Sequence, residues 1–350
     1  MKNRKNLIST LVLVALILLT FLAILRGQNV GELLDAMNHA NPVYILCGIL
    51  AVVAFLVGQG VIFRFMLHVL NQRTNFHKCI GYSFKGYFFS SVTPFQIGGP
   101  PAQILYMKKD NVPVPVASML VLIVATVYKV VLIIVGFGLI IFGQGFMKQY
   151  YTTSTYVFMG VGLFLTCGFC WILYMFMFHP KFAKKAIFKF FRWMERVHLM
   201  KHKPGREEGI EMGMSRYTQT ADFFRSHKGT IVVLFLLTAL QRFCLFSVTY
   251  FVYRAMGLQG ESVWKIVLLQ SVVSLCVDML PIPGGVGISE ALFANLFSSI
   301  FTAATLMPGL ALSRGISYYG QLLLCAGYLF ISKYAFAGRR RKAEENAKQT

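Results

Sequence analysis

Charged side chains are scarce in this sequence, and acidic ones are the scarcest. Only 13 of the 350 residues are Asp or Glu, and charged residues together make up 13% of the chain. A soluble domain of this length carries about twice that charged share. The surface of a soluble globular fold cannot be covered from this composition, so that class is excluded.

The spacings that hold metals, form disulfide frameworks or bind nucleotide phosphates are also missing. The seven histidines show no H-x-x-x-H pattern, and no P-loop occurs. Cys167 and Cys170 form a C-x-x-C, but inside an apolar run, where two small apolar side chains on a buried helix explain it. We therefore expect no metal, no cofactor and no direct use of ATP.

Hydrophobic residues are abundant instead, at 56% of the chain with a mean hydropathy of +0.62. Several runs reach the ~20 apolar residues that cross a bilayer core. The first run is longer than a signal-peptide core and has no small-residue cleavage site, so we expect it to be retained. The sequence predicts an all-α polytopic membrane protein with six full transmembrane helices. They lie at about 7–25, 43–63, 116–140, 155–178, 230–253 and 310–334.

Two further apolar regions, 79–109 and 262–301, are interrupted near the middle by proline and glycine. Their arms are about 14 to 18 residues long, too short to cross ~30 Å of hydrocarbon comfortably. Irregular backbone survives at membrane depth only where protein buries it or it lines a wet cavity. Each region is therefore predicted to be a re-entrant helical hairpin.

The two breaks have proline and glycine in a similar order. In SVTPFQIGGPPAQ, Pro94 stops one arm, Gly98 and Gly99 turn, and Pro100 and Pro101 suit the first turn of the returning helix. In MLPIPGGVGISEALF, two prolines stop the arm, three glycines permit a turn, and a serine caps a helix expected to begin at Glu290. These residues are Pro281, Pro283, Gly284, Gly285, Gly287 and Ser289.

Each break is expected to point a helix N-terminus, with free N–H groups, into the membrane interior, where it favours an anion such as phosphate. Discontinuous helices of transporters work this way. The plain alternative is a kink packed by its neighbours. The candidate phosphate-binding residues are Gly98, Gly99, Pro101, Gln103, Pro281, Pro283, Gly284, Gly285, Gly287 and Ser289.

Five charged residues fall inside apolar segments. Charges are expensive in lipid, so they face inward and pair. Ion pairs among these five residues are enough to explain their presence. Because they occur in the same chain as the two breaks, however, a polar pathway for a substrate is favoured. These residues are Lys129, Arg242, Asp278, Glu290 and Arg314, with Arg314 expected near the outer end of the last span.

The distribution of Lys and Arg gives the orientation. Six spans and two hairpins place 27 of them on one side, which holds both termini, and 4 on the other. The richer side should be cytoplasmic, so the first hairpin enters from the cytoplasm and the second from outside. Phe63-Arg64 and Tyr253-Arg254 precede Gly98 and Gly284 by 34 and 30 residues. Two such units of opposite orientation indicate an inverted repeat.

The loop 179–228 carries 12 Lys or Arg against 5 acids. One helical face of 183–197 is apolar and the other is basic, which is typical of an interfacial helix lying on anionic lipid. A connector helix packed on the bundle explains the pattern equally well. The expected organisation is a membrane domain over 1–338, including this loop, and a basic cytoplasmic tail over 339–350.

The segments TPFQIGGPPAQILYMKK (93–109) and PIPGGVGISE (281–290) resemble the flippase-like membrane region of the lysylphosphatidylglycerol synthase family, also called multiple peptide resistance factors. The likeness covers nearly the whole chain and is greatest to stand-alone members of Gram-positive bacteria. Pro100 stands where the family more often has a polar residue.

This resemblance implies a bacterial cell-membrane protein that binds and translocates phosphatidylglycerol or its lysyl form, and so contributes to resistance against cationic peptides. Full-length family enzymes add a soluble domain that transfers lysine from tRNA to lipid. Only AFAGRRRKAEENAKQT follows the last predicted span, so we expect no such domain here and a separate synthase as a candidate partner. The alternatives are a phosphatidylglycerol lysyltransferase and a small-solute secondary transporter.

Nucleic acid is not an expected partner despite a formal charge of +21, because the basic residues lie beside the apolar runs. The sequence leaves the oligomeric state open.

Overall fold

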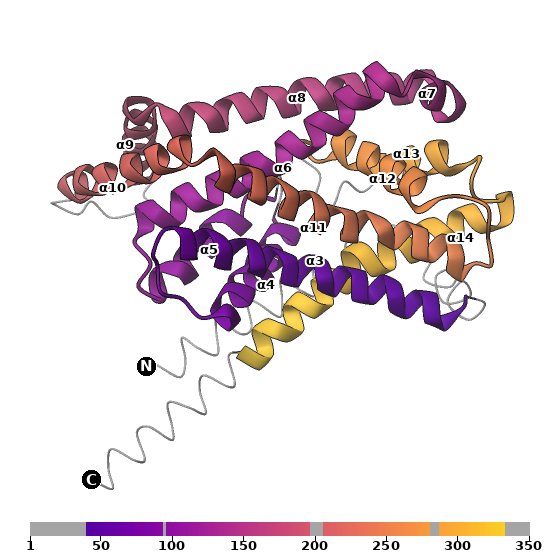
Figure 1. Cartoon of the computed structure of the whole chain (residues 1–350), viewed down its shortest axis with the longest axis horizontal. Helices are drawn as coiled ribbons and strands as arrows, with labels where there is room; N and C mark the ends of the chain where they lie inside the picture. The colour runs from indigo at the N-terminus through magenta and orange to yellow at the C-terminus, as the bar shows by residue number, and fades with distance from the viewer. Residues whose placement is uncertain (1–39, 94–95, 197–205, 281–286, 333–350) are drawn as a thin grey trace, which may run out of the picture.

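A computed structural model describes residues 40–93, 96–196, 206–280 and 287–332 of the chain. Within these ranges every regular element is helical, and the long helices run side by side along the long axis of the molecule (Figure 1). The last helix, after the π-helix η3, continues over 321–332. The elements are α3 (Pro42–Val69), α4 (Phe76–Ser91), α5 (Gly99–Lys109), α6 (Val114–Phe142), α7 (Gln144–Tyr150), α8 (Thr153–Phe178), α9 (Pro180–Arg196), α10 (Arg206–Ser226), α11 (Lys228–Ala255), α12 (Val263–Val277), α13 (Ile288–Phe297), α14 (Ala303–Arg314) and η3 (Gly315–Gly320).

Four of the predicted spans are confirmed as helices long and apolar enough to cross a membrane: α3, α6, α8 and α11. Each has 26 to 29 residues, more than the ~20 that a bilayer core requires. The span predicted at 7–25 lies outside the described residues. The count of six full spans therefore stays a prediction.

The last predicted span begins earlier than expected. Helix runs without interruption from Ala303 through α14, η3 and on to 332, instead of starting near 310. The hydroxyl of Thr305 accepts the N–H of Thr302 at 3.0 Å, and this cap starts the helix ahead of Pro308. As a result Arg314 lies well inside this helical stretch, which corrects its predicted place near the outer end.

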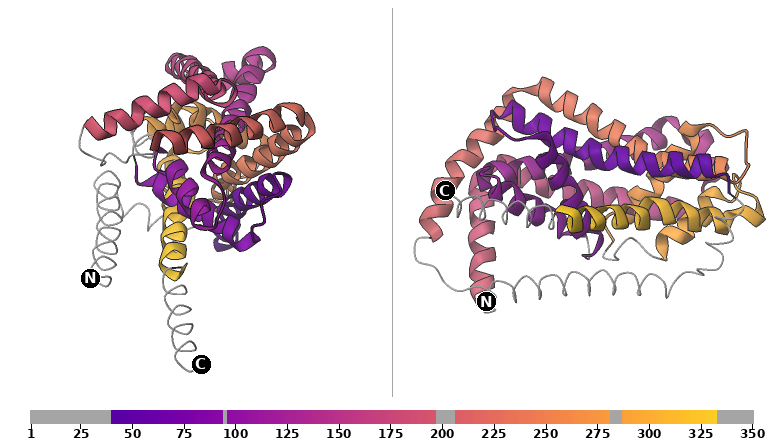
Figure 2. Two further views of the ribbon diagram at one scale, coloured as in Figure 1. Left: turned by 90° about the vertical axis from the view of Figure 1, so that its left-hand side faces the viewer. Right: turned by 90° about the horizontal axis from the view of Figure 1, so that it is seen from below.

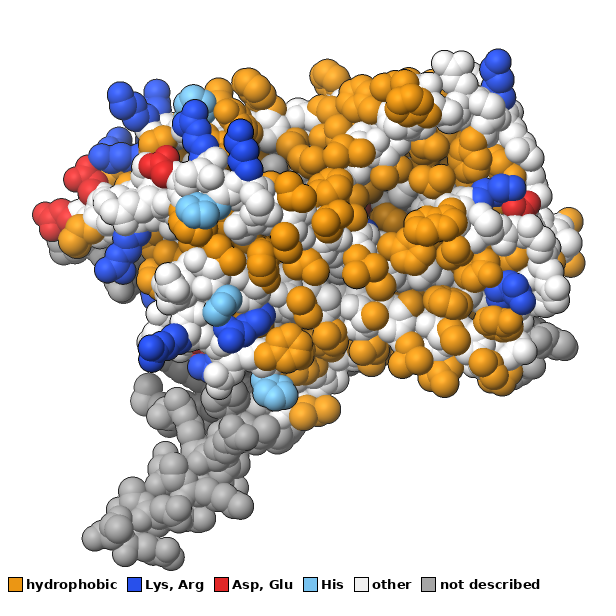
Figure 3. Space-filling model, viewed as in Figure 1, with side chains coloured by type: hydrophobic (Ala, Val, Ile, Leu, Met, Phe, Trp, Pro, Cys, Tyr) orange, Lys and Arg blue, Asp and Glu red, His pale blue; other side chains and the backbone are white. Residues whose placement is uncertain are grey.

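On the face shown in Figure 3, apolar side chains cover the middle, and most Lys and Arg side chains lie at the end that carries α9 and α10. Large hydrophobic side chains on the long helices are exposed, among them Ile134, Phe164 and Leu236 at 53%, 78% and 60%. Such a belt would be unstable against water, and it is the surface that lipid tails cover. The fold is that of a multi-pass membrane protein.

The two interrupted regions form two pairs of short helices, α4–α5 and α12–α13, which lie toward opposite ends of the bundle (Figure 1). Each pair follows a 28-residue helix, α3 or α11, and precedes another long helical stretch. The N–H of Asn41 donates to the carbonyl of Ala255 at 2.8 Å, so the start of α3 meets the end of α11 and the two run antiparallel. The order of a long helix, a short pair and a long stretch thus occurs twice, and the two long helices that open it run in opposite directions.

Glycines bring α4 and α5 into close contact. A Cβ on Gly99 would lie 2.9 Å from the carbonyl oxygen of Gly86, and one on Gly98 would lie 2.8 Å from that of Phe89. Any larger residue at either position would push the two helices apart. The Gly-Gly pair is therefore required by packing as well as by the turn.

The basic loop forms two helices, α9 and α10. Residues Tyr217, Ala221 and Phe224 of α10 are buried, and the Tyr217 hydroxyl donates to the carbonyl of Phe176 at the end of α8 at 2.8 Å. Burial raises the pKa of the Tyr217 phenol, which therefore stays protonated as a donor. α10 is thus a connector helix packed on the bundle.

Candidate functional site

At the first break, a side chain of the break itself hydrogen-bonds the backbone on both sides of it. The N–H of Gly98 donates to the hydroxyl of Thr93 at 2.9 Å, and that hydroxyl donates to the carbonyl of Phe89 at 2.7 Å. As predicted, Pro100 and Pro101 lie in the first turn of α5. Proline has no N–H, and the Gly98 N–H is already paired, so fewer N–H groups remain at this helix start than the prediction assumed. Pro94 lies outside the described residues.

Two further candidates of this hairpin have different surroundings. Gln103 packs against Gly86 of α4, so its side chain joins the two arms of the hairpin. Pro101 is exposed on the surface of the described chain. Neither residue lies among the buried charges described below.

At the second break, an acidic side chain caps the helix N-terminus. Gly287 has a φ of +91° and is the N-cap of α13, and its N–H donates to the carboxylate of Glu290. Ser289 is therefore inside the helix and is not its cap, which corrects the prediction. The helix begins at Ile288 because glycine accepts the left-handed backbone and Glu290 caps it. Pro281, Pro283, Gly284 and Gly285 lie outside the described residues.

Glu290 also pairs with Arg314. Its carboxylate lies 3.3 Å from the Arg314 Nε, and both side chains are largely buried. The positive end of α13 thus already faces a carboxylate that is itself held by a cation. The Gly287 N–H at this helix N-terminus is thus paired with a side chain of the protein, and the predicted phosphate site at this break stays a prediction.

A buried ion pair lies at the mid-depth of the bundle. The carboxylate of Asp278, directly after α12, accepts hydrogen bonds from the Tyr128 hydroxyl and from the Lys129 Nζ, the latter at 3.0 Å. The side chains of Lys129 and Asp278 are 8% and 17% exposed. Lys129 is near the middle of α6, so the end of α12 reaches the centre of the bundle.

Arg242 joins this pair through Tyr128. The guanidinium lies 3.5 Å from the centre of the Tyr128 ring and 5.1 Å from that of Phe55, so aromatic faces cover it on α6 and α3. Its buried Nε has no hydrogen-bond acceptor among the residues the structure describes. Arg242 is near the middle of α11, at the same depth as Lys129.

Two glutamine side chains extend the polar contacts from Arg242 to the first hairpin. The side-chain amide of Gln241 donates to Gln59 Oε1 at 3.0 Å and to the Tyr87 hydroxyl at 3.2 Å. Tyr87 in turn donates to Gln59 Oε1 at 3.2 Å. Together with the charges this forms one set from α3, α4, α6, α11 and α12. We call it the central polar cluster: Gln59, Tyr87, Tyr128, Lys129, Gln241, Arg242 and Asp278.

The structure thus divides the predicted charged pathway into two groups. Lys129, Arg242 and Asp278 belong to the central polar cluster, while Glu290 and Arg314 form a second pair. The cluster holds two cations against one carboxylate, so it carries excess positive charge inside a membrane domain. Its four uncharged members were missed from the sequence, although Gln59 and Gln241 inside predicted spans were a usable signal.

Each of the two hairpins contacts the other half of the fold at the end of its first arm. Asp278 ends the first arm of the second hairpin. It contacts Lys129 of α6, the long helix that follows the first hairpin. The carbonyl of Ser91, at the end of the first arm of the first hairpin, accepts from the Tyr318 hydroxyl of the last helix at 3.0 Å. Each hairpin therefore contacts the long helix that follows the other hairpin.

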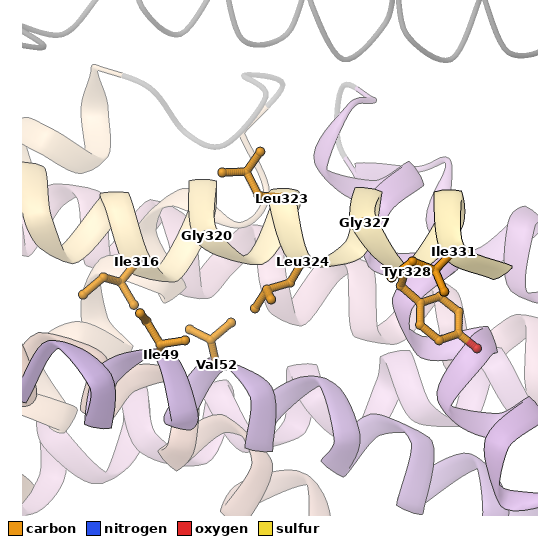
Figure 4. Close-up of a pocket in the computed structure, with 9 residues that line it drawn as sticks. All are labelled: Ile49, Val52, Ile316, Gly320, Leu323, Leu324, Gly327, Tyr328 and Ile331. Carbon is orange, nitrogen blue, oxygen red and sulfur yellow. The ribbon is translucent and has the colours of Figure 1, made fainter. Parts of the chain in front are cut away.

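A separate surface groove of about 440 Å³ lies between α3 and the last helix (Figure 4). Its walls are almost entirely apolar, and the Tyr328 hydroxyl is the polar group among them. Such a groove suits a hydrocarbon chain and offers nothing to hold a charged headgroup. It is lined by Ile49, Val52, Ile316, Gly320, Leu323, Leu324, Gly327, Tyr328 and Ile331.

Comparison with known proteins identifies the family. The model of the lysylphosphatidylglycerol synthase TM region matches residues 6–325, and the chain belongs to this family. The resemblance expected from the two break motifs is confirmed. A search of curated proteins found no match. In the described part of the chain, His, Cys, Asp and Glu do not gather into a group that could hold a metal ion.

Proposed function

We propose that the protein binds the headgroup of an anionic or aminoacylated phospholipid at the central polar cluster and carries it across the bilayer. Phosphatidylglycerol and lysyl-phosphatidylglycerol are the lipids that the family description favours. The observation that carries the proposal is the excess positive charge at mid-depth, where Lys129 pairs with Asp278 and Arg242 lies on the ring of Tyr128 without a carboxylate partner of its own among the described residues.

Electrostatics explains why a phosphate would stop at this place. An unpaired charge in hydrocarbon costs several kcal/mol or more, so a crossing headgroup needs fixed partners. A phosphate oxygen can take the position that Asp278 holds beside Lys129, or accept from the unsatisfied Nε of Arg242. Asp278 would hold the cations in place while no lipid is bound.

The repeated order of elements supports an alternating route. In this proposal α3–α6 and α11 onward are an inverted repeat, and the two hairpins re-enter from opposite faces toward the cluster. The basic end that holds α9 and α10 would be cytoplasmic, and both termini with it. The protein would act in a bacterial cell membrane and contribute to resistance against cationic peptides. A separate synthase would supply its lysyl lipid.

Movement of lipid and synthesis of lipid are separated by one reconstitution. Purified protein in liposomes is supplied with headgroup-labelled phosphatidylglycerol, lysyl-phosphatidylglycerol or phosphatidylcholine. We expect the first two to cross at least 10-fold faster than in protein-free vesicles, and phosphatidylcholine to cross at the protein-free rate. In parallel, lysyl-tRNA is added and the lipids are analysed. Formation of lysyl lipid without accelerated crossing would overturn the proposal in favour of a synthase.

A small-solute transporter is tested in the same vesicles. If none of the three lipids moves faster than in protein-free liposomes while labelled lysine or another amino acid is taken up, the central cluster binds a small solute and the lipid proposal is wrong. Lipid movement that is unaffected by excess amino acid supports the proposal.

A further inference from the structure

Helix α9 lies across the axis of the bundle. In Figure 1 it is seen nearly end-on beside the horizontal long helices, and in the right-hand view of Figure 2 it extends across them at the end that carries the basic residues. A helix perpendicular to the spanning helices lies parallel to the plane of a membrane that those helices cross. This is the orientation of an interfacial helix.

One side of α9 presents a stripe of exposed cations. The spacing of these residues, three to four apart, places them in a single row along the helix. Six Lys or Arg stand in α9 against one acid, Glu195. The exposed members of the row are Lys181, Lys185, Lys189, Arg192 and Arg196.

Two large apolar side chains border this row. Phe182 and Trp193 are 45% and 55% exposed, and both fall on the same edge of the cationic stripe. Basic side chains beside exposed aromatic ones are the composition that binds the headgroup region of a bilayer. In water, exposure of the two aromatic rings would be unfavourable.

The opposite side of α9 is fixed to the protein. Ala183 is fully buried, and the Lys184 ammonium forms an ion pair with Glu211 of α10. α10 is itself packed on the bundle through Tyr217. These contacts set the rotation of α9 about its own axis, so the cationic row points away from the other helices that the structure describes.

We propose that α9 binds anionic phospholipid headgroups of the membrane leaflet at the basic end of the bundle. The cationic row would contact several phosphates at once, and Phe182 and Trp193 would enter the boundary between headgroups and acyl chains. This lipid-binding surface is distinct from the central polar cluster. It would enrich anionic lipid beside the protein, whether or not the protein moves that lipid.

The three tryptophans of the chain supply the probe and its control. A variant that keeps only Trp193 (Trp171→Phe with Trp264→Phe) is placed in nanodiscs of mixed lipid, in which bromine is carried by either phosphatidylglycerol or phosphatidylcholine. We expect brominated phosphatidylglycerol to quench Trp193 at least twice as strongly as brominated phosphatidylcholine. The control keeps only Trp264, which is 65% exposed on α12 at the other end, and should show no preference.

Two changes should remove the preference. Replacing Lys181, Lys185 and Lys189 by Gln alters only exposed side chains, so folding is retained, and quenching by the two brominated lipids should become equal. Raising the salt concentration to about 1 M, where the screening length is ~3 Å, should weaken the preference in the unchanged helix.

Two results would overturn the proposal. The first is equal quenching of Trp193 by both lipids before any lysine is changed. The second is strong quenching of Trp193 by aqueous acrylamide with none by either lipid, which would show a helix facing water and a surface for an acidic soluble partner. Gel filtration of every variant confirms that the compared proteins are folded.

Discussion

Asp278 is the one carboxylate of the central polar cluster. It accepts hydrogen bonds from Tyr128 and Lys129, and the guanidinium of Arg242 stacks over the ring of Tyr128. Removing one member of a buried charge pair leaves the other uncompensated, at a cost of ~3–5 kcal/mol. Loss of protein and loss of function must therefore be separated at this site.

A double-mutant cycle makes that separation. We expect Asp278→Asn and Lys129→Gln each to lower the thermal midpoint of the protein in detergent, because each leaves one buried charge without its partner. The double variant should recover most of the loss, since both charges are gone. It should nevertheless move lipid more slowly than the unchanged protein, because a phosphate partner is missing. Simple addition of the two stability losses would show that the residues are not coupled.

The charged members of the site could be predicted from the sequence, and its two glutamines gave a usable signal, but its two tyrosines could not be predicted. Lys129, Arg242 and Asp278 are conspicuous because charge inside an apolar run is costly. Tyr87 and Tyr128 look like ordinary aromatic residues of a membrane helix, and their roles depend on the rotation of one helix against another. Apolar periodicity does not give that rotation when a helix is hydrophobic on all sides.

The two hairpins differ in how their breaks are held. The first uses the Thr93 hydroxyl and two prolines, and the second uses the carboxylate of Glu290. The sequence predicted the positions of both breaks, because Pro and Gly interrupt helices. It placed the second helix start at the wrong residue, since Ser289 matched a capping preference while Gly287 with its φ of +91° determined the start.

The close contact of the first hairpin gives a test at the level of an element. Gly99→Val should lower the thermal midpoint markedly, by the equivalent of ~1–3 kcal/mol, because the new side chain would meet the backbone of Gly86. Gly138→Val is the matched control, since a Cβ at Gly138 in α6 meets nothing within 4 Å. Midpoints are compared by fluorescence-detected gel filtration after heating. Equal midpoints in the two variants would show that the hairpin does not need its glycine.

At the scale of the whole molecule, charge and shape agree on two distinct ends. Lys148 lies in α7 and Lys189 in α9, at opposite ends of α8 (Figure 1). The apolar runs predicted the long helices because lipid imposes the same composition on every spanning segment. The packing of α3 against α11, and the meeting of five helices at one cluster, depend on long-range contacts that the runs do not encode.

The orientation has a direct test. Cysteine is introduced at Lys148 or Lys189 in a background with the seven native cysteines replaced by serine. In intact cells a membrane-impermeant maleimide should label the Lys148→Cys protein, while the Lys189→Cys protein should react only after the membrane is opened. Labelling of both positions from the same side would contradict the topology.

The measurement closest to the central claim is the rate of phosphatidylglycerol movement in liposomes by three forms of the protein. Arg242→Gln removes the cluster guanidinium, and Arg216→Gln is its control, an identical change at an exposed position of α10. At equal amounts of folded protein, we expect Arg242→Gln to be at least 10-fold slower than the unchanged chain and Arg216→Gln to match it. If Arg242→Gln moved phosphatidylglycerol as fast as Arg216→Gln does, the cluster would be a structural feature of the bundle and would not bind the lipid headgroup.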